Sequence, residues 1–344
     1  MHTLRCDILI LGAGPAGMAA ALSAAACNKQ VIILDDNPAP GGQIWRAGPQ
    51  TTLPALARRY RDAIAASAAI RMVNGARLIA RPSARSVLFE TADGGGVVDW
   101  QKLILCCGAR ELSLPFPGWT LPGVTGAGGL QAQIKQGLSL KGEKVVIAGS
   151  GPLLLAVADT VNKAGGQVTN IIEQAALPAL LRFASGLWRW PQKLRQLATL
   201  APKGYLSGAQ AIRAHGTTRL EAVTLRQRGV ERTIACDRLA IGYGLVPNIE
   251  TGLLFGCATA QEAIQVNRWQ QTGLADIYAA GSSQQAQALF ARQRPLVVRL
   301  AAAAAKRTAG PRPRGNAYCP RPAERRAVTA TLLHHRARQG RQAQ

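Results

Sequence analysis

The sequence lacks the paired cysteines, histidine clusters and long uncharged helices that several classes of protein require. Its seven cysteines include no Cys-x-x-Cys pair, so disulfide-reductase chemistry, which needs two sulfurs able to exchange, is not expected. No group of cysteines and histidines has the spacing of a zinc site, and we expect no metal. The four histidines fall in the termini or in a predicted loop, so we assign no catalytic residue. The scatter of the cysteines is typical of a reducing compartment, which predicts a cytoplasmic protein.

Charged residues are also missing from residues 8–26, an almost wholly apolar stretch. Asp7 precedes it where a signal sequence would carry basic residues, and glycines interrupt it. No other stretch reaches the length of a spanning helix without charge. We therefore expect no transmembrane segment.

What the sequence does contain is a pair of glycine-rich turns, each between an apolar run and a helix-forming run. In the first, Gly12 permits a tight turn, Gly14 lets the backbone approach a pyrophosphate, and Gly17 lets the next helix pack closely. A second apolar run, residues 31–34, ends at Asp35, where a carboxylate would bind the ribose of an adenine dinucleotide. The order of these features predicts a dinucleotide-binding unit.

The second glycine-rich turn matches the dinucleotide-binding pattern less well than the first. Gly149 and Gly151 follow the apolar run 145–148, and Glu173 ends a later predicted strand. A carboxylate at this position repels a 2′-phosphate, so a nicotinamide cofactor bound here would be NAD rather than NADP. Leu154, however, stands where a third glycine or an alanine is expected. The second unit is therefore predicted to bind NAD, another adenine nucleotide or no nucleotide.

Further segments indicate how the two units are connected. An apolar run ends at Gly108, prolines and glycines mark a crossover at residues 115–123, and residues 277–281 resemble a last short strand. We predict an α/β fold with two Rossmann-like three-layer dinucleotide-binding domains, the second inserted in the first. The expected division is 1–115 for the first part of the first domain, 116–240 for the inserted domain, 241–281 for the return, and 282–344 for an atypical basic tail.

These motifs together resemble a known superfamily. Gly-Ala-Gly-Pro-Ala-Gly at 12–17, Gly-Gly-Gln at 41–43, Cys-Gly-Ala-Arg at 107–110 and Ile-Tyr-Ala-Ala-Gly at 277–281 are similar to the pyridine nucleotide-disulfide oxidoreductases with two dinucleotide domains. Residues 35–46 and 117–124 more narrowly resemble the flavoprotein subunits of opine oxidase, hydrogen cyanide synthase and heteromeric proline or hydroxyproline dehydrogenases. The resemblance implies bound FAD and a partner subunit.

The residues that we expect at the two sites follow from these turns and from the resemblance. The candidates for FAD are Gly12, Gly14, Pro15, Ala16, Gly17, Asp35, Asp36, Gly42, Gln43, Gly108, Ala109, Arg110 and Gly281, and those for the second nucleotide are Gly149, Gly151 and Glu173.

The end of the chain departs from the superfamily's pattern. Residues 281–344 hold 13 Lys or Arg and one acid, Glu324, in a chain of formal net charge +23. Clustered arginines can neutralise the phosphates of nucleic acid or of an anionic membrane surface, but the segment has few aromatics, and its prolines forbid a long basic helix, so nucleic acid is not expected as a partner. A diverged disordered extension is one alternative. Our preferred hypothesis is a shifted reading frame in a GC-rich gene, which would weaken FAD binding and which resequencing tests.

The predicted function is that of an FAD-dependent oxidoreductase subunit in a heteromeric dehydrogenase or oxidase. Through a second flavoprotein subunit, it would oxidise a C–N bond of an amino acid, imino acid or opine and pass the electrons to an acceptor. One alternative is a self-contained NADH-dependent flavin reductase, which the second turn favours. Another is a non-catalytic nucleotide-binding subunit or defective gene product, which the tail favours.

Overall fold

The first of two main sheets is built around the amino-terminal strand. The computed structural model of the chain describes residues 2–49, 51–186 and 204–283. The sheet has the order β3-β2-β1-β6-β5-β4, and β19 also pairs with β6. The pairings among β3, β2, β1, β6 and β19 are parallel, whereas β5 pairs antiparallel with both β6 and β4. The bounds are β1 His2–Leu11, β2 Val31–Asp35, β3 Ile70–Asn74, β4 Arg77–Ala80, β5 Ser86–Thr91, β6 Gly94–Leu105 and β19 Ile277–Ala279.

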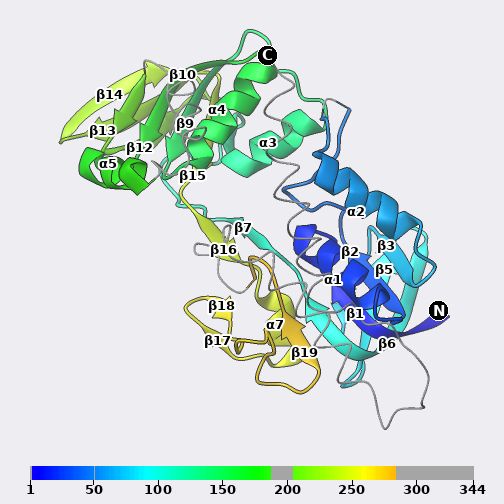
Figure 1. Ribbon diagram of the computed structural model, residues 1–344. Coiled ribbons are helices and arrows are strands. Elements are labelled where there is room, and N and C mark those ends of the chain that lie inside the picture. The colour runs from blue at the N-terminus through cyan, green and yellow to red at the C-terminus, as the bar shows by residue number, and fades with distance from the viewer. Residues whose placement is uncertain (1, 50, 187–203, 284–344) are drawn as a thin grey trace, which may run out of the picture.

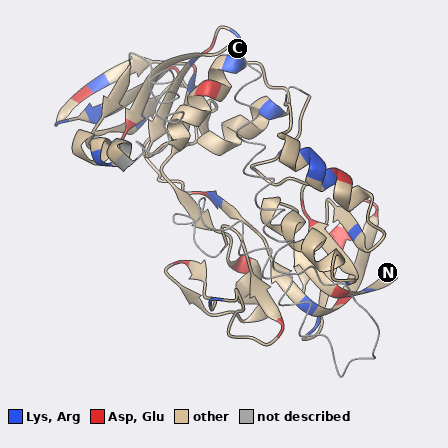
Figure 2. Cartoon of the chain, viewed as in Figure 1, with Lys and Arg blue, Asp and Glu red and all other residues tan. Residues whose placement is uncertain are grey.

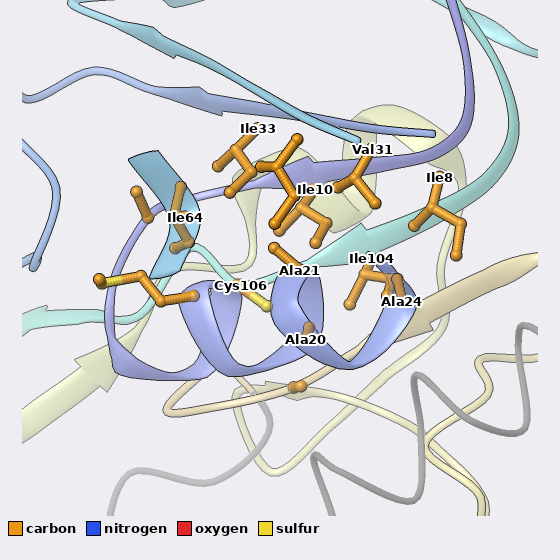
Figure 3. Close-up of a cluster of buried hydrophobic side chains, with 14 of the residues drawn as sticks. Ile8, Ile10, Ala20, Ala21, Ala24, Val31, Ile33, Ile64, Ile104 and Cys106 are labelled. Carbon is orange, nitrogen blue, oxygen red and sulfur yellow. The ribbon is translucent and has the colours of Figure 1, made fainter. Parts of the chain in front are cut away.

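Both faces of this sheet are buried, which explains the continuous apolar runs in its central strands. Successive side chains of a strand point to opposite faces, so Ile8 and Ile10 join one core while Leu9 and Leu11 join the other. Helices α1 (Pro15–Ala25) and α2 (Ala55–Ala65) supply residues to the first core. Figure 3 shows Ala21 and Ala24 of α1 turned toward the strand residues of that core. Small alanines let the helix lie close to the sheet.

The second main sheet is wholly parallel, with the order β11-β10-β9-β15-β8. Helices α3 and α4 pack on one face, and a three-stranded antiparallel sheet, β12-β13-β14, packs on the other. This makes three layers. The bounds are β8 Val124–Gly126, α3 Ala127–Lys135, β9 Lys144–Gly149, α4 Leu153–Lys163, β10 Gln167–Glu173, α5 Leu177–Gly186, β11 Tyr205–Ser207, β12 Ala209–His215, β13 Ala222–Gln227, β14 Val230–Ala235 and β15 Arg238–Gly242.

The chain leaves the first part through β7 (Ala109–Glu111) and returns through β16 (Leu245–Pro247), and these two strands pair antiparallel. Figure 1 shows this strand pair between the two sheets. Helix α7 (Glu250–Phe255) and the hairpin β17 (Thr259–Ala260) and β18 (Ala263–Ile264) follow, before β19 rejoins the first sheet on β6. The second unit is thus inserted in the first, as predicted. The boundaries at residues 115 and 240 stay predictions.

Two further expectations concern the tail and the absence of a transmembrane segment. The tail, residues 282–344, lies outside the described residues except for Ser282 and Ser283. Among the helices that are described, none combines the length and the apolar character needed to cross a membrane.

Candidate functional site

The first glycine-rich turn joins β1 to α1 at the carboxyl end of the parallel strands. Gly12 has a φ of +102°, and a Cβ on it would lie 2.4 Å from the Cys106 carbonyl oxygen. A Cβ on Gly17 would lie 1.9 Å from the carbonyl oxygen of Gly12. Only glycine fits at either position. These contacts hold the helix start against the strand end, as a dinucleotide-binding turn requires.

Gly14 faces open space, since a Cβ built on it would have nothing within 4 Å. It is the N-cap of α1, and among the described residues no side chain caps this helix and no acid lies in its first turn. Gly42 covers the turn, because a Cβ built on Gly42 would lie 3.1 Å from the Gly14 Cα. The neighbouring Gly41 N–H donates to the Ala13 carbonyl at 2.8 Å. An uncapped helix start beside open space suits a pyrophosphate, so these residues fit FAD.

Asp35 ends β2 beside this turn and is 4% exposed. Its carboxylate accepts hydrogen bonds from Ala13 N–H and from the backbone and side-chain N–H groups of Asn37, the latter two at 2.8 Å. Two carboxylate oxygens have about four acceptor positions, so one remains for a ribose hydroxyl. Asp36 is exposed and accepts from the Asn37 side chain at 2.9 Å.

The other FAD candidates divide into two groups. Pro15 and Ala16 begin α1, and Gly281 lies against that start, because its Cβ would be 3.2 Å from the Ala16 Cβ. Gly108 follows β6 with a φ of +71°. Ala109 and Arg110, by contrast, lie in β7, where Arg110 pairs with Glu250 at 2.6 Å and contacts Asn248 at 3.1 Å. Arg110 also lines a cavity of about 370 Å³, together with Leu112, Val246, Pro247, Ile249, Glu250, Leu253 and Glu262.

The second turn differs from the first in where its helix begins. α1 starts one residue after Gly14, whereas α4 starts two residues after Gly151, with Pro152 as its N-cap. Leu154 is fully buried in the core, and its Cδ2 would lie 3.3 Å from a Cβ on Gly242. The leucine thus fills the space between α4 and the end of β15, where a glycine would allow closer packing.

Glu173 is also fully buried and already has three donors. Gly151 N–H and Ala175 N–H donate to its carboxylate at 2.9 and 2.8 Å, and the Tyr205 hydroxyl donates at 3.3 Å. Burial and the neighbouring carboxylate raise the pKa of Tyr205, so its proton stays on the phenol oxygen. Sequence reasoning missed Tyr205, which lies 32 positions from Glu173 and belongs to no motif.

The adjacent Cys106 and Cys107 follow β6 beside the first turn. Cys106 is buried and Cys107 is half-buried, and both are free thiols. Burial raises the pKa of Cys107 to about 11, so the thiol is protonated at neutral pH. His215, expected in a loop, instead ends strand β12, with its Nε2 2.6 Å from the Thr224 hydroxyl. Within the described residues, no cluster of His, Cys, Asp or Glu could hold a metal ion.

Comparison with known protein families shows which family the chain belongs to. The model of the pyridine nucleotide-disulphide oxidoreductases matches residues 6–305, which include both glycine-rich turns. The chain belongs to this family. The family assignment confirms the predicted class of enzyme, an oxidoreductase, and implies FAD and a pyridine nucleotide as the ligands of the fold. The match continues past Gly281 into the tail, whose origin stays a prediction.

Two curated relatives of this oxidoreductase are subunits of larger enzymes. Hydrogen cyanide synthase subunit HcnB of Pseudomonas aeruginosa is 32% identical over 304 residues, which cover 79% of this chain and 65% of the relative. An opine oxidase subunit of Rhizobium meliloti is 31% identical over 275 residues, covering 73% of this chain and 52% of the relative. The chain therefore spans less than two thirds of the length of either relative.

A solved structure with the same fold is thioredoxin reductase of T. acidophilum. It has a TM-score of 0.68 and 22% sequence identity, and the alignment covers 88% of this chain and 99% of that one. The likeness confirms the predicted fold of two dinucleotide-binding domains. The site residues stay predictions, because no comparison tests them individually.

Proposed function

We propose that this oxidoreductase is the FAD-binding subunit of a heteromeric enzyme that oxidises a C–N bond in an amino acid, an imino acid or an opine. The observation that carries the proposal is the first turn, where uncapped α1, open space at Gly14 and the acceptor on Asp35 fit an adenine dinucleotide. The names of the relatives, hydrogen cyanide synthase and opine oxidase subunits, support the substrate class and the partner.

Bound FAD would supply the acceptor for the two electrons that leave the substrate as its C–N bond becomes a C=N bond. The chain's own residues would bind and orient that cofactor. The α1 amides would neutralise the pyrophosphate, Asp35 would accept the ribose hydroxyl, and Gly42 would close over the turn. The electrons would then pass to a partner or external acceptor, and the two protons would go to solvent or to that acceptor.

The experiment uses the chain purified with its partner from the source organism. Glycine, proline, sarcosine and octopine are each added anaerobically, and flavin reduction is followed by absorption. We expect one of these C–N substrates to reduce the flavin, with a dye reoxidising it. Reduction by none of them would contradict the substrate class.

The second candidate is a self-contained NADH-dependent flavin reductase, which the position of Glu173 at the end of β10 favours. The buried Leu154, which fills the space between α4 and the end of β15, counts against NAD in this unit. We expect NADH to leave the flavin of the purified chain oxidised. Rapid bleaching by NADH without a partner would favour the reductase instead.

The location in the cytoplasm stays a prediction. It is supported by Cys6, Cys106, Cys107, Cys236 and Cys257, which are free thiols.

A further inference from the structure

Arg46 has no acidic partner among the described residues, although it lies beside the first glycine-rich turn. Its Nη2 donates to two neutral oxygens, Asn37 Oδ1 at 2.9 Å and Gln43 Oε1 at 3.2 Å. Its Nε is buried and has no hydrogen-bond partner. A buried donor without a partner destabilises the structure, and more so when the group is charged. The guanidinium charge is therefore unmatched in the protein alone.

A second unmatched cation comes from the inserted domain. Lys135 lies in the last turn of α3 and is half-buried, with no ion pair to any described acid. The backbone of Gly48, two residues beyond Arg46, packs so closely that a Cβ on it would overlap the Lys135 carbonyl oxygen. Burial lowers the pKa of Lys135, and the charge of Arg46 lowers it further. Figure 2 shows basic residues on both α2 and α3, the helices flanking this region.

The segment that carries Arg46 rests on the dinucleotide turn. Gly42 contacts Gly14, and Gly41 N–H bonds to the Ala13 carbonyl at 2.8 Å. Asn37 links Arg46 to Asp35, since its side chain accepts from the arginine and donates to the aspartate at 2.8 Å. Arg46 is thus joined to the candidate ribose acceptor through one side chain and belongs to the same loop that covers Gly14.

Two like charges in a partly desolvated place repel each other unless an anion lies between them. Asp35 and Asp36 bond to Asn37, and neither of them forms an ion pair with Arg46 or Lys135. A diphosphate carries two negative charges and accepts charge-assisted bonds from both arginine and lysine. It is also the group that the uncapped start of α1 suits.

We infer that Arg46 and Lys135 form a cationic clamp for the diphosphate of the dinucleotide held by the first turn. This rests on the proposed function, which places FAD in that turn. The clamp takes one cation from the first domain and one from the inserted domain, so binding of the dinucleotide fixes the two domains against each other.

The test compares Arg46→Gln and Lys135→Gln with the wild-type chain by calorimetric titration with FAD, ADP and adenosine. We expect each substitution to weaken FAD and ADP by about tenfold or more, while the affinity for adenosine, which lacks phosphate, changes by less than about twofold. Arg59→Gln is the matched control, because Arg59 is an exposed arginine of α2 with no hydrogen bond or ion pair among the described residues. It should bind all three ligands as the wild type does.

The outcomes separate the clamp from the proposed function. A folded wild-type chain that binds neither FAD nor ADP overturns both. If the wild-type chain binds FAD but both variants bind ADP as tightly as the wild type does, the clamp is overturned and the proposed function is not. Equal losses for ADP and adenosine also overturn it, since they would mean that the residues shape the site without contacting the phosphates.

Discussion

At the scale of single residues, Gly14 and Gly17 differ in what a methyl group would meet. A Cβ on Gly17 would collide with the Gly12 carbonyl, whereas a Cβ on Gly14 would point into open space. Gly17 is therefore needed for the fold, and Gly14 is needed only if a ligand occupies that space. The two positions allow folding and binding to be tested separately.

We expect Gly14→Ala to change the free energy of unfolding by no more than about 1 kcal/mol, the scale of an N-cap change, while FAD affinity falls about tenfold or more. Gly17→Ala should destabilise the chain by about 1–3 kcal/mol or more through overpacking. Urea unfolding and FAD titration measure the two effects. Gly273→Ala, at a position with open space and no positive φ, is the control for both. Unchanged FAD affinity in Gly14→Ala would argue against a ligand at this turn.

The ion pair of Lys102 and Asp276 makes stability depend on pH. Lys102 is buried and donates to Asp276 at 2.7 Å, and Arg85 contacts the other carboxylate oxygen at 2.6 Å. The hydrogen bond from Lys102 lowers the pKa of Asp276. A lowered carboxyl pKa adds stability above the carboxyl's ordinary pKa, about 4, and that stability is lost as the pH falls through the lowered value.

We expect Asp276→Asn to destabilise the chain by about 2 kcal/mol at neutral pH, because it leaves a buried ammonium without its counter-ion. The difference from the wild type should shrink as the pH falls below about 4. Chemical unfolding at neutral and acidic pH measures it. A difference that is constant across the pH range would show that the charge of Asp276 does not matter.

At the scale of elements, a carboxylate from the connecting strand β7 caps a helix of the inserted domain. Glu111 accepts from Gly128 N–H at 2.7 Å and from Gly129 N–H at 3.0 Å, at the start of α3. The contact satisfies two amides that the helix itself leaves free and places a negative charge at its positive end. It also attaches β7 to the domain that follows it.

Glu111→Ala should remove this cap and cost about 1 kcal/mol of stability. We expect faster hydrogen exchange in the first turn of α3, with the core strands β1 and β9 unaffected. Glu111→Gln retains an acceptor and should show a smaller loss. Unaltered exchange at α3 in Glu111→Ala would mean that solvent caps the helix equally well.

The elements that the sequence predicts well are those specified locally. Gly12, Gly17 and the apolar residues 8–11 define strand, turn and helix through sterics and burial within a short segment. The contacts of Glu111 with α3, of Tyr205 with Glu173 and of Lys135 with the Arg46 loop were not predicted. Each joins segments far apart in sequence, and only the folded chain brings them together.

At the scale of the whole molecule, the insertion makes the first domain depend on the end of the described chain. β19 pairs with β6 only after the chain has passed through the second sheet, and Gly281 then reaches the start of α1. The last residues before the tail therefore lie against the first glycine-rich turn. A change in sequence after Gly281 would act next to that turn, which links the origin of the tail to cofactor binding.

The central claim, that the first turn holds FAD, is tested most directly by the near-ultraviolet and visible absorption spectrum of the purified full chain, with the released cofactor identified by chromatography. The account predicts a flavin spectrum and stoichiometric FAD. A folded, colourless chain that also fails to take up added FAD would contradict it.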